Sequence, residues 1–148
     1  MGDNYCRLGE YGEAAEWYRK AADQNDSKAQ KALGDLYARG DGVGRNVPKA
    51  LELYEKAAKQ GVTEAKKAMG DLYVKGDGIG KNVPKALELY QEAAKQGVTE
   101  AQKALGDLYA SGADGVGKNA SKAREWYQKA ADQGDQEAKD KLAELDKK

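Results

Sequence analysis

A glycine-rich segment at residues 112–119, Gly-Ala-Asp-Gly-Val-Gly-Lys-Asn, is the part of this sequence most similar to a catalytic motif. Its spacing fits G-x-x-x-x-G-K, the loop whose backbone N–H groups and lysine hold nucleotide phosphates. However, Asn119 stands where a serine or threonine would bind magnesium, and a helical pattern precedes the segment where such a loop needs a strand. We therefore interpret it as a turn, and we predict no catalytic or cofactor-binding residue.

The other residues that could carry chemistry are one cysteine and one aspartate in each glycine-rich turn. Cys6 has no histidine to activate it, because the chain contains none. We interpret it as a small apolar residue or a free thiol. Asp41, Asp77 and Asp114 supply one carboxylate per turn, far fewer than the six to eight oxygen ligands of calcium. No metal site is predicted.

The charge balance and the distribution of apolar residues each exclude one class of partner. Lysine and arginine number 25 and aspartate and glutamate number 25, so the 148 residues carry no net charge. A protein without a basic excess is not expected to bind nucleic acid. No apolar run approaches the length of a membrane span, and the first residues show no basic-then-apolar signal. We expect no membrane partner, and a cytoplasmic protein or one that exists only in recombinant form.

A repeat organises the whole chain. The segment Ala-Leu-Gly-Asp-Leu-Tyr at residues 32–37 returns as Ala-Met-Gly-Asp-Leu-Tyr at 68–73 and unchanged at 104–109, a period of 36 residues. Residues 26–61 and 62–97 agree at most positions. A period of this length is typical of solenoids, in which stacked units bury one another's apolar faces.

Within each unit the apolar spacing is helical. Ala29, Ala32, Leu33, Leu36 and Tyr37 recur at i, i+3, i+4, i+7 and i+8, which forms one stripe of a helix. A second stripe of the same kind covers residues 50–58. No segment alternates with a period of two, so we predict an all-α chain.

The residues between the stripes predict where the helices begin and end. Asn46 is expected to cap the second helix of the unit, with Pro48 in its first turn, and Gly61 to end it in a left-handed conformation. Gly34, Gly70 and Gly106 lie inside helices, where glycine costs about 1 kcal/mol relative to alanine. We expect close helix packing there, with tyrosine rings of neighbouring units filling the space.

These residues resemble the Sel-one-like repeat, a relative of the tetratricopeptide repeat. The family pattern is A-x-x-x-L-G-x-x-Y, a glycine-rich turn, and then K-A-x-x-x-Y-x-x-A-A-x-x-G. Its positions in the first full unit are Ala29, Leu33, Gly34, Tyr37, Lys49, Ala50, Tyr54, Ala57, Ala58 and Gly61. The resemblance implies a right-handed α-solenoid of stacked antiparallel helix pairs, whose first helices line a concave face. The β-lactam binding linked to cysteine-rich members is not carried over, because this chain lacks their cysteine pairs.

The predicted organisation is a single solenoid domain over residues 1–148. It comprises a truncated first unit with a tetratricopeptide-like turn, three full repeats and a capping helix, at residues 1–25, 26–61, 62–97, 98–134 and 135–148. Trp17 and Trp126 occupy the position that Leu53 and Leu89 fill in the middle units, and we expect them to pack between helices. The truncated unit leaves its tyrosines short of neighbours, which predicts self-association or a protein partner at that end.

The resemblance places the candidate binding residues on the concave face. These are Lys31, Asp35, Arg39, Lys67, Asp71, Lys75, Lys103 and Asp107. Related chaperone-binding domains clamp a C-terminal carboxylate with lysine and asparagine, but the aspartates here would repel such a ligand. The alternative interpretation is that Lys31, Asp35 and Arg39 only pair with one another along a solvated helix.

Two functions remain open from the sequence, and neither is enzymatic. The segment Asn-Val-Pro-Lys-Ala-Leu-Glu-Leu-Tyr is unchanged between residues 46–54 and 82–90. Recent duplication and consensus design both produce such uniformity. The concave face without an evident ligand, the conservative substitutions between repeats and the tetratricopeptide-like first turn favour an engineered repeat scaffold of the protein- or peptide-binding type without an evolved ligand. The alternative is a natural intracellular adaptor fragment that binds a protein or peptide on its concave face.

Overall fold

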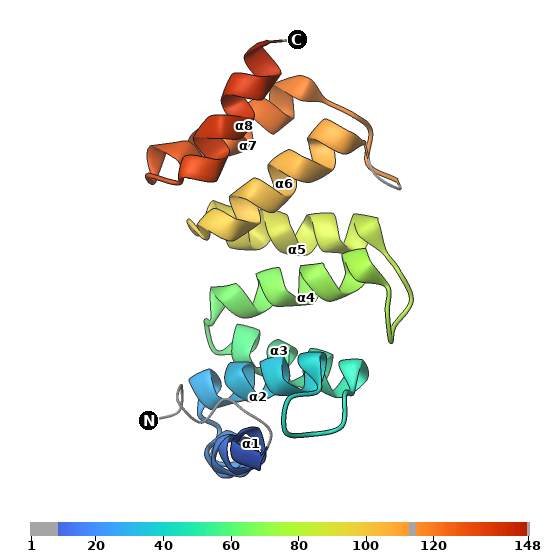
Figure 1. Ribbon diagram of the computed structural model, residues 1–148, viewed down its shortest axis with the longest axis vertical. Coiled ribbons are helices and arrows are strands. Elements are labelled where there is room, and N and C mark those ends of the chain that lie inside the picture. The colour runs from blue at the N-terminus through green and yellow to red at the C-terminus, as the bar shows by residue number, and fades with distance from the viewer. Residues whose placement is uncertain (1–8, 113–114, 148) are drawn as a thin grey trace.

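A computed structural model describes residues 9–112 and 115–147 of the chain (Figure 1). All regular structure in these residues is α-helical, which confirms the all-α prediction. The helices are α1 Gly9–Asp23, α2 Ser27–Arg39, α3 Val47–Lys59, α4 Thr63–Lys75, α5 Val83–Lys95, α6 Thr99–Ser111, α7 Ala120–Asp132 and α8 Gln136–Asp146.

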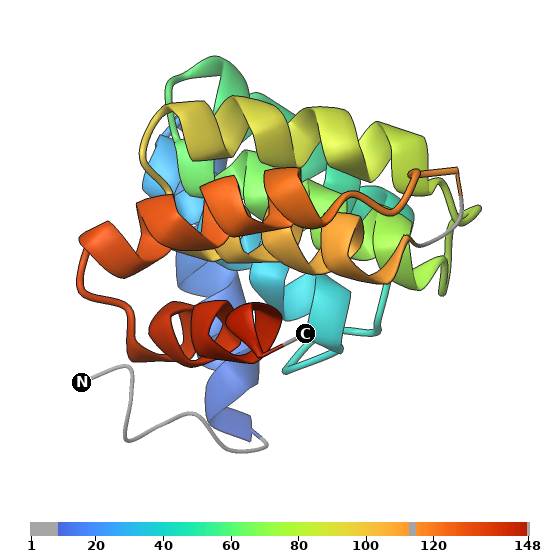
Figure 2. The same ribbon diagram turned by 90° about the horizontal axis from the view of Figure 1, so that it is seen from above.

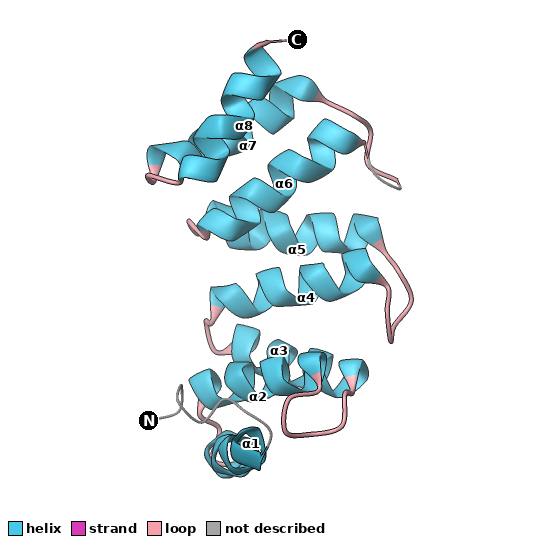
Figure 3. Ribbon diagram, viewed as in Figure 1, coloured by secondary structure: helices cyan, strands magenta, loops and turns pink. Residues whose placement is uncertain are grey.

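The helices stack in chain order into a solenoid, with α1 and α8 at opposite ends (Figure 1). The most extensive packing is within the pairs α2–α3, α4–α5 and α6–α7, and each pair then packs on the next. Longer glycine-rich loops join the two helices of each pair on one side, and short turns join successive pairs on the other (Figure 3). Seen along the stack, the helices of successive pairs lie over one another (Figure 2). The predicted α-solenoid is therefore confirmed.

The helix ends lie where the sequence predicted them. Asn46 caps α3, and its side-chain oxygen accepts a hydrogen bond from the backbone N–H of Lys49 at 3.0 Å. Pro48 lies in the first turn of α3, where its missing N–H needs no partner. Gly61 follows the end of the helix with a φ of 97°, a left-handed conformation that favours glycine.

Alanine supplies much of the core. Ala50, Ala57, Ala65, Ala93 and Ala101 are completely buried at the contacts between successive helices. Small side chains let helices approach closely, so that few large apolar residues are needed to fill the space between them. This explains how a chain without phenylalanine and with few branched apolar residues forms its buried core.

The expected close approach at the helical glycines is confirmed, but the expected origin of the covering rings is wrong. The ring of Tyr90 in α5 lies against Gly70 in α4, and Tyr54 lies against Gly34 in the same way. Each ring therefore comes from the second helix of the same pair and not from a neighbouring unit. The cause is the turn between the two helices, which folds the tyrosine back onto the glycine of its own hairpin.

Hydrogen bonds and an ion pair join successive units at both edges of the stack. On the loop side, the Arg45 guanidinium donates to the backbone oxygen of Asp77 at 3.1 Å and pairs with its carboxylate at 3.2 Å. On the side of the short turns, the Gln133 amide donates to the backbone oxygen of Gly97 at 3.2 Å. These bonds fix how each helix pair lies on the one before it.

Replacing Gly70 with alanine should lower the free energy of unfolding by up to about 2 kcal/mol. An added Cβ would lie 2.6 Å from Cε1 and 2.9 Å from Cδ1 of Tyr90. Overpacking of this kind costs about 1–3 kcal/mol, and the better helix propensity of alanine returns about 1 kcal/mol. Urea denaturation measures the difference. Gly80→Ala is the matched control, because nothing lies within 4 Å of its added Cβ; an equal loss in both variants would contradict the packing argument.

Candidate functional site

Each helix pair places a tyrosine hydroxyl against a carboxylate on the first helix. The Tyr54 hydroxyl donates to Oδ1 of Asp35 at 2.5 Å, and that of Tyr90 donates to Oδ1 of Asp71 at 2.6 Å. The third pair repeats this contact between Tyr127 and Asp107 at 2.5 Å. The aspartate directly follows the glycine that the ring covers. The glycine therefore gives the ring room to pack, and the aspartate accepts the hydrogen bond from its hydroxyl.

A lysine one turn earlier completes the arrangement in the first two pairs. Lys31 Nζ donates to Oδ2 of Asp35 at 3.0 Å, and Lys67 Nζ donates to Oδ2 of Asp71 at 2.8 Å. Each aspartate thus accepts one bond from a tyrosine and one from a lysine, on different oxygens. This part of the expected pairing along the helix face is confirmed, and the tyrosine contact is a second role for the aspartates that the sequence did not reveal.

The last pair departs from this pattern because α8 packs beside it. Lys103 Nζ lies 3.3 Å from an Asp135 carboxylate oxygen and 3.7 Å from one of Glu137. Asp107 instead accepts from Lys141 of α8 at 2.6 Å. Residues at the start of α8 and Lys141 within it thus form ion pairs with the third unit. These pairs hold α8 against the last full repeat.

Burial and these contacts change the ionisation of the tyrosines. Burial, and then the hydrogen bond to Asp35, raise the pKa of Tyr54 far above its ordinary value. The pKa of Tyr90 is raised by burial and by Asp71, and that of Tyr127 by burial and by Asp107. All three hydroxyls therefore remain protonated donors at neutral pH. Their role here is structural, because a donor committed to a neighbouring carboxylate is not available as a general base.

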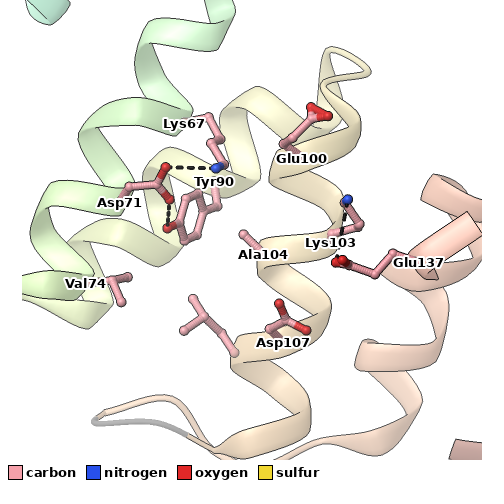
Figure 4. Close-up of a pocket in the computed structure, with 10 residues that line it drawn as sticks. Lys67, Asp71, Val74, Tyr90, Glu100, Lys103, Ala104, Asp107 and Glu137 are labelled. Carbon is pink, nitrogen blue, oxygen red and sulfur yellow. Dashed lines mark hydrogen bonds and ion pairs between the residues drawn. The ribbon is translucent and has the colours of Figure 1, made fainter. Parts of the chain in front are cut away.

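Two hollows lie along the face formed by the first helices of the pairs, the face that the resemblance predicted to be concave. The hollow over α2 and α4 has a volume of about 360 Å³, and the one over α4 and α6 has a volume of about 340 Å³. Both are lined by Lys67, Asp71 and Glu100, so the hollows meet there. Figure 4 shows the second hollow, with Asp71 between Lys67 and Tyr90 and with Ala104 at its centre. We name the two joined hollows the concave groove.

The structure brings six of the eight candidate residues to the concave groove. These are Lys31, Asp35, Lys67, Asp71, Lys103 and Asp107. Arg39 does not line the groove. Its guanidinium bonds to Asp41 at 2.7 Å, and not to Asp35, the partner expected under the alternative interpretation. The reason is that Asp41 lies in the turn directly after α2, within easy reach of Arg39. Lys75 lies exposed at the end of α4, outside the groove lining.

Three further acidic residues also line the groove: the resemblance had placed Glu64 and Glu100 on the concave face without making them binding candidates, and Glu137 was not expected there. Glu64, Glu100 and Glu137 occupy the first turns of α4, α6 and α8. Glu137 lies near Lys103, but within residues 9–112 and 115–147 neither Glu64 nor Glu100 has an ion-pair partner. Glu64 and Glu100 are 36 residues apart and Glu137 follows 37 residues later, so the repeat was a signal in the sequence for this row.

The structure gives no support for a phosphate-binding or metal-binding role of the sequence motifs within the described residues. The glycine-rich segment after Ser111 joins two helices, α6 and α7, and a phosphate-binding loop follows a strand. No group of three or more His, Cys, Asp or Glu side chains in the described ranges is placed to hold a metal ion. Cys6, Tyr5 and Asp114 lie outside the described residues.

A comparison with protein families identifies the repeat. The model of the Sel1 repeat matches four successive segments, residues 6–26, 27–62, 63–98 and 99–135. The chain belongs to the Sel1 repeat family. Its four matched segments account for α1 and the three helix pairs, so the Sel1 units coincide with the structural units described above. No curated protein matches the sequence.

Solved structures of Sel1 repeat proteins are similar to this chain. A protective antigen of uropathogenic Escherichia coli with this fold, c5321, is 37% identical, with a TM-score of 0.85 over 91% of this chain and 29% of that one. A Sel1 repeat protein from Oxalobacter formigenes is 36% identical, with a TM-score of 0.81 over 90% and 54%. Cysteine-rich protein B of Helicobacter pylori is 25% identical, with a TM-score of 0.65 over 85% and 90%.

The chain spans under a third of the Escherichia coli protein and about half of the Oxalobacter protein. Sel1 repeat proteins are generally non-enzymatic scaffolds that mediate protein–protein interaction. Among the described helices of this Sel1 chain, none combines the length and the apolar character needed to cross a membrane.

Proposed function

We propose that this Sel1 repeat chain is a non-enzymatic scaffold that binds an extended, basic segment of a partner protein in its concave groove. The observation that carries the proposal is the continuity of the groove, whose two hollows meet at Lys67, Asp71 and Glu100. A continuous groove across successive helices suits a chain that runs along the stack. The interaction role of the family supports the same function.

The charge of the groove favours a basic partner. Its lining contains twice as many carboxylates as lysines, namely Asp35, Glu64, Asp71, Glu100, Asp107 and Glu137 against Lys31, Lys67 and Lys103. All three lysines already pair with carboxylates of the chain itself. The unpaired charge therefore belongs to Glu64 and Glu100. Complementary charge speeds encounter and selects among partners, so lysine or arginine side chains spaced to reach these two residues fit best.

The apolar part of the groove supplies the rest of the contact. Ala68 and Leu72 of α4 line the first hollow, and Ala104 and Leu108 of α6 line the second. Small side chains between charged edges leave room for the backbone and short apolar side chains of a bound segment. We infer a recognition sequence in which basic residues alternate with small apolar ones.

Fluorescence anisotropy tests this function with two labelled peptides that alternate alanine with lysine or alanine with glutamate. We expect only the lysine peptide to bind, with affinity that falls as salt is added. The double variant Glu64→Gln/Glu100→Gln should bind about 2- to 30-fold more weakly, because each exposed charge pair contributes about 0.2–1 kcal/mol. Glu52→Gln/Glu88→Gln, two exposed glutamates on α3 and α5, is the matched control. Equal binding of both peptides, or an equal loss in the control, would refute the proposal.

An engineered origin, with a groove that has no evolved ligand, is the second candidate. Two observations support it: the unchanged segment at residues 46–54 and 82–90, and the use of Asp35 and Asp71 within the fold itself. It predicts that neither peptide binds and that the melting temperature is high. The first proposal predicts saturable binding of the basic peptide, so one titration distinguishes the two.

A further inference from the structure

In the third unit, a lysine from the next helix binds the aspartate that holds the tyrosine. Lys141 of α8 donates to Oδ1 of Asp107 at 2.6 Å, the same oxygen that accepts the hydroxyl hydrogen of Tyr127 at 2.5 Å. The ammonium nitrogen of Lys141 also lies 5.8 Å from the centre of the Tyr127 ring. A carboxylate and the face of an aromatic ring both attract an ammonium ion. The third unit therefore contains a binding site for a lysine side chain, and the chain itself supplies the lysine.

The first two units have alanine where α8 carries this lysine. Helix α8 continues the repeat, because its Ala138 corresponds to Ala101 of α6, 37 residues earlier, and both are completely buried. In this register Lys141 corresponds to Ala104 of α6, which in turn corresponds to Ala68 of α4. The space that the lysine side chain occupies in the third unit is therefore left open in the other two.

This open space coincides with the two hollows of the concave groove. The hollow of about 340 Å³ is lined by Ala104 together with Asp71 and Tyr90, and Figure 4 shows these three side chains around it. The hollow of about 360 Å³ is lined by Ala68 and by the tyrosine and aspartate of the first pair. Each hollow thus has the ring and the carboxylate of the third site, with an alanine in place of the lysine.

The charges around the second hollow can accommodate one more cation. Lys67 already pairs with Asp71 at 2.8 Å, so a further ammonium ion there needs another carboxylate to balance it. In the third unit Lys103, the equivalent of Lys67, pairs with acidic residues at the start of α8, among them Glu137 at 3.7 Å. Glu100 is the equivalent of Glu137 and lines the same hollow as Lys67. Lys67 can therefore turn to Glu100 when another lysine takes the aspartate.

We propose that each hollow binds one lysine side chain of the partner segment. The stem of this lysine lies over Ala68 or Ala104, and its ammonium group donates to the aspartate oxygen that the tyrosine also uses. The lysine of the chain then turns to the neighbouring glutamate, as Lys103 does in the third unit. This inference rests on the proposed function and specifies how the basic segment is recognised, namely by two lysines that are one repeat apart along the stack.

Filling both hollows from within the chain tests the assignment. The double variant Ala68→Lys/Ala104→Lys places a lysine where α8 carries Lys141. We expect it to bind the labelled lysine–alanine peptide about tenfold more weakly than the wild type in fluorescence anisotropy, because two charge pairs are lost. Gly80→Lys/Ser111→Lys is the matched control, since it adds the same charge at two exposed positions outside the groove lining. This control should bind the peptide nearly as well as the wild type does.

Removing the lysine of the third site should have the opposite effect. Lys141→Ala gives α8 the residue type of the other two units and leaves Asp107 open to a partner. A lysine–alanine peptide long enough to span three units should bind this variant about 2- to 5-fold more tightly than the wild type. Lys139→Ala, which removes the same charge from an exposed position of α8, should give no such gain. This test does not depend on the folding of the double lysine variant.

The ring of Trp17 is an alternative place where the lysines of the peptide could bind. Trp17 is 72% exposed, so the expectation that it packs between helices is wrong. Trp17→Ala should leave peptide binding unchanged, and a loss of binding in this variant would overturn both the lysine sites and the groove. If the wild type binds the peptide and Ala68→Lys/Ala104→Lys binds it equally well, the lysine sites are refuted while binding elsewhere in the groove remains. If the wild type binds no peptide, the proposed function fails together with this inference.

Discussion

Replacing Tyr90 with alanine should lower the free energy of unfolding by about 3–5 kcal/mol, the range observed for large buried aromatic residues. Tyr90 is only 3% exposed, and its ring lies directly against Gly70. Its removal leaves a cavity beside a glycine and also frees one oxygen of Asp71 from its hydroxyl partner. Urea denaturation followed by circular dichroism measures the change.

Two controls divide this loss into its parts. Tyr90→Phe keeps the ring and removes the hydroxyl, so it should cost only about 1–3 kcal/mol, the range for a hydrogen bond to a charged group. Trp17→Ala removes a comparably large aromatic from an exposed position and should change stability by less than about 0.5 kcal/mol. If Tyr90→Ala costs no more than Tyr90→Phe, the ring does not provide the stabilisation that we assign to it.

Raising the pH above about 10 should destabilise the protein steeply, more than other proteins whose tyrosines are exposed. The pKa of Tyr54, Tyr90 and Tyr127 is raised in the folded state above the ordinary value of 10.0. The unfolded chain therefore releases protons that the folded chain retains. Stability is complete below pH 10, and it declines as the pH rises towards the folded-state pKa values.

The expected slope follows from the number of protons retained. Each such tyrosine contributes about −1.4 kcal/mol per pH unit to the free energy of unfolding. The full slope is reached only well above pH 10, and the hydroxyls are only partly buried, so that solvent screening reduces the effect; we expect a combined loss of about 1–3 kcal/mol from pH 10 to pH 11. Denaturation curves across this range measure it.

The double variant Tyr54→Phe/Tyr90→Phe separates the tyrosines from other groups that titrate at alkaline pH. Its stability at neutral pH should be lower, but its decline above pH 10 should have about one third of the slope, because only Tyr127 remains. The lysines are unchanged in this variant, so their contribution stays in both curves. An unchanged slope would show that the tyrosines do not cause the alkaline loss.

The parts of the fold that could be predicted from sequence were those set by local rules. Asn46 and Pro48 define the start of a helix by their own chemistry, and the stripe that includes Leu33 defines its buried face. The position of Gly70 inside a helix was enough to predict a close approach. In each case the information lies within a few residues of the feature that it determines.

The parts that could not be predicted depend on contacts between distant residues. Nothing near Asp71 indicates that Tyr90, 19 residues later, will bind it, because this depends on how the hairpin closes. Likewise, Lys103 has the same helical spacing to Asp107 as Lys67 has to Asp71. Only the position of α8 explains why Lys141 takes its place. Six of the eight candidate residues therefore line the groove, and the pairing of Lys31 with Asp35 was expected, while the tyrosine partners and Lys141 were not.

In the pairs α2–α3 and α4–α5 the tyrosine–aspartate–lysine contact closes within one helix pair, and this has a consequence for the length of the molecule. A further copy of residues 63–98 would bring its own ring, glycine and carboxylate, and would need no new partner from the rest of the chain. Insertion of such copies should therefore lengthen the molecule by the same distance per copy. The reach of any bound segment would then grow in equal increments with copy number, while its local chemistry stayed constant.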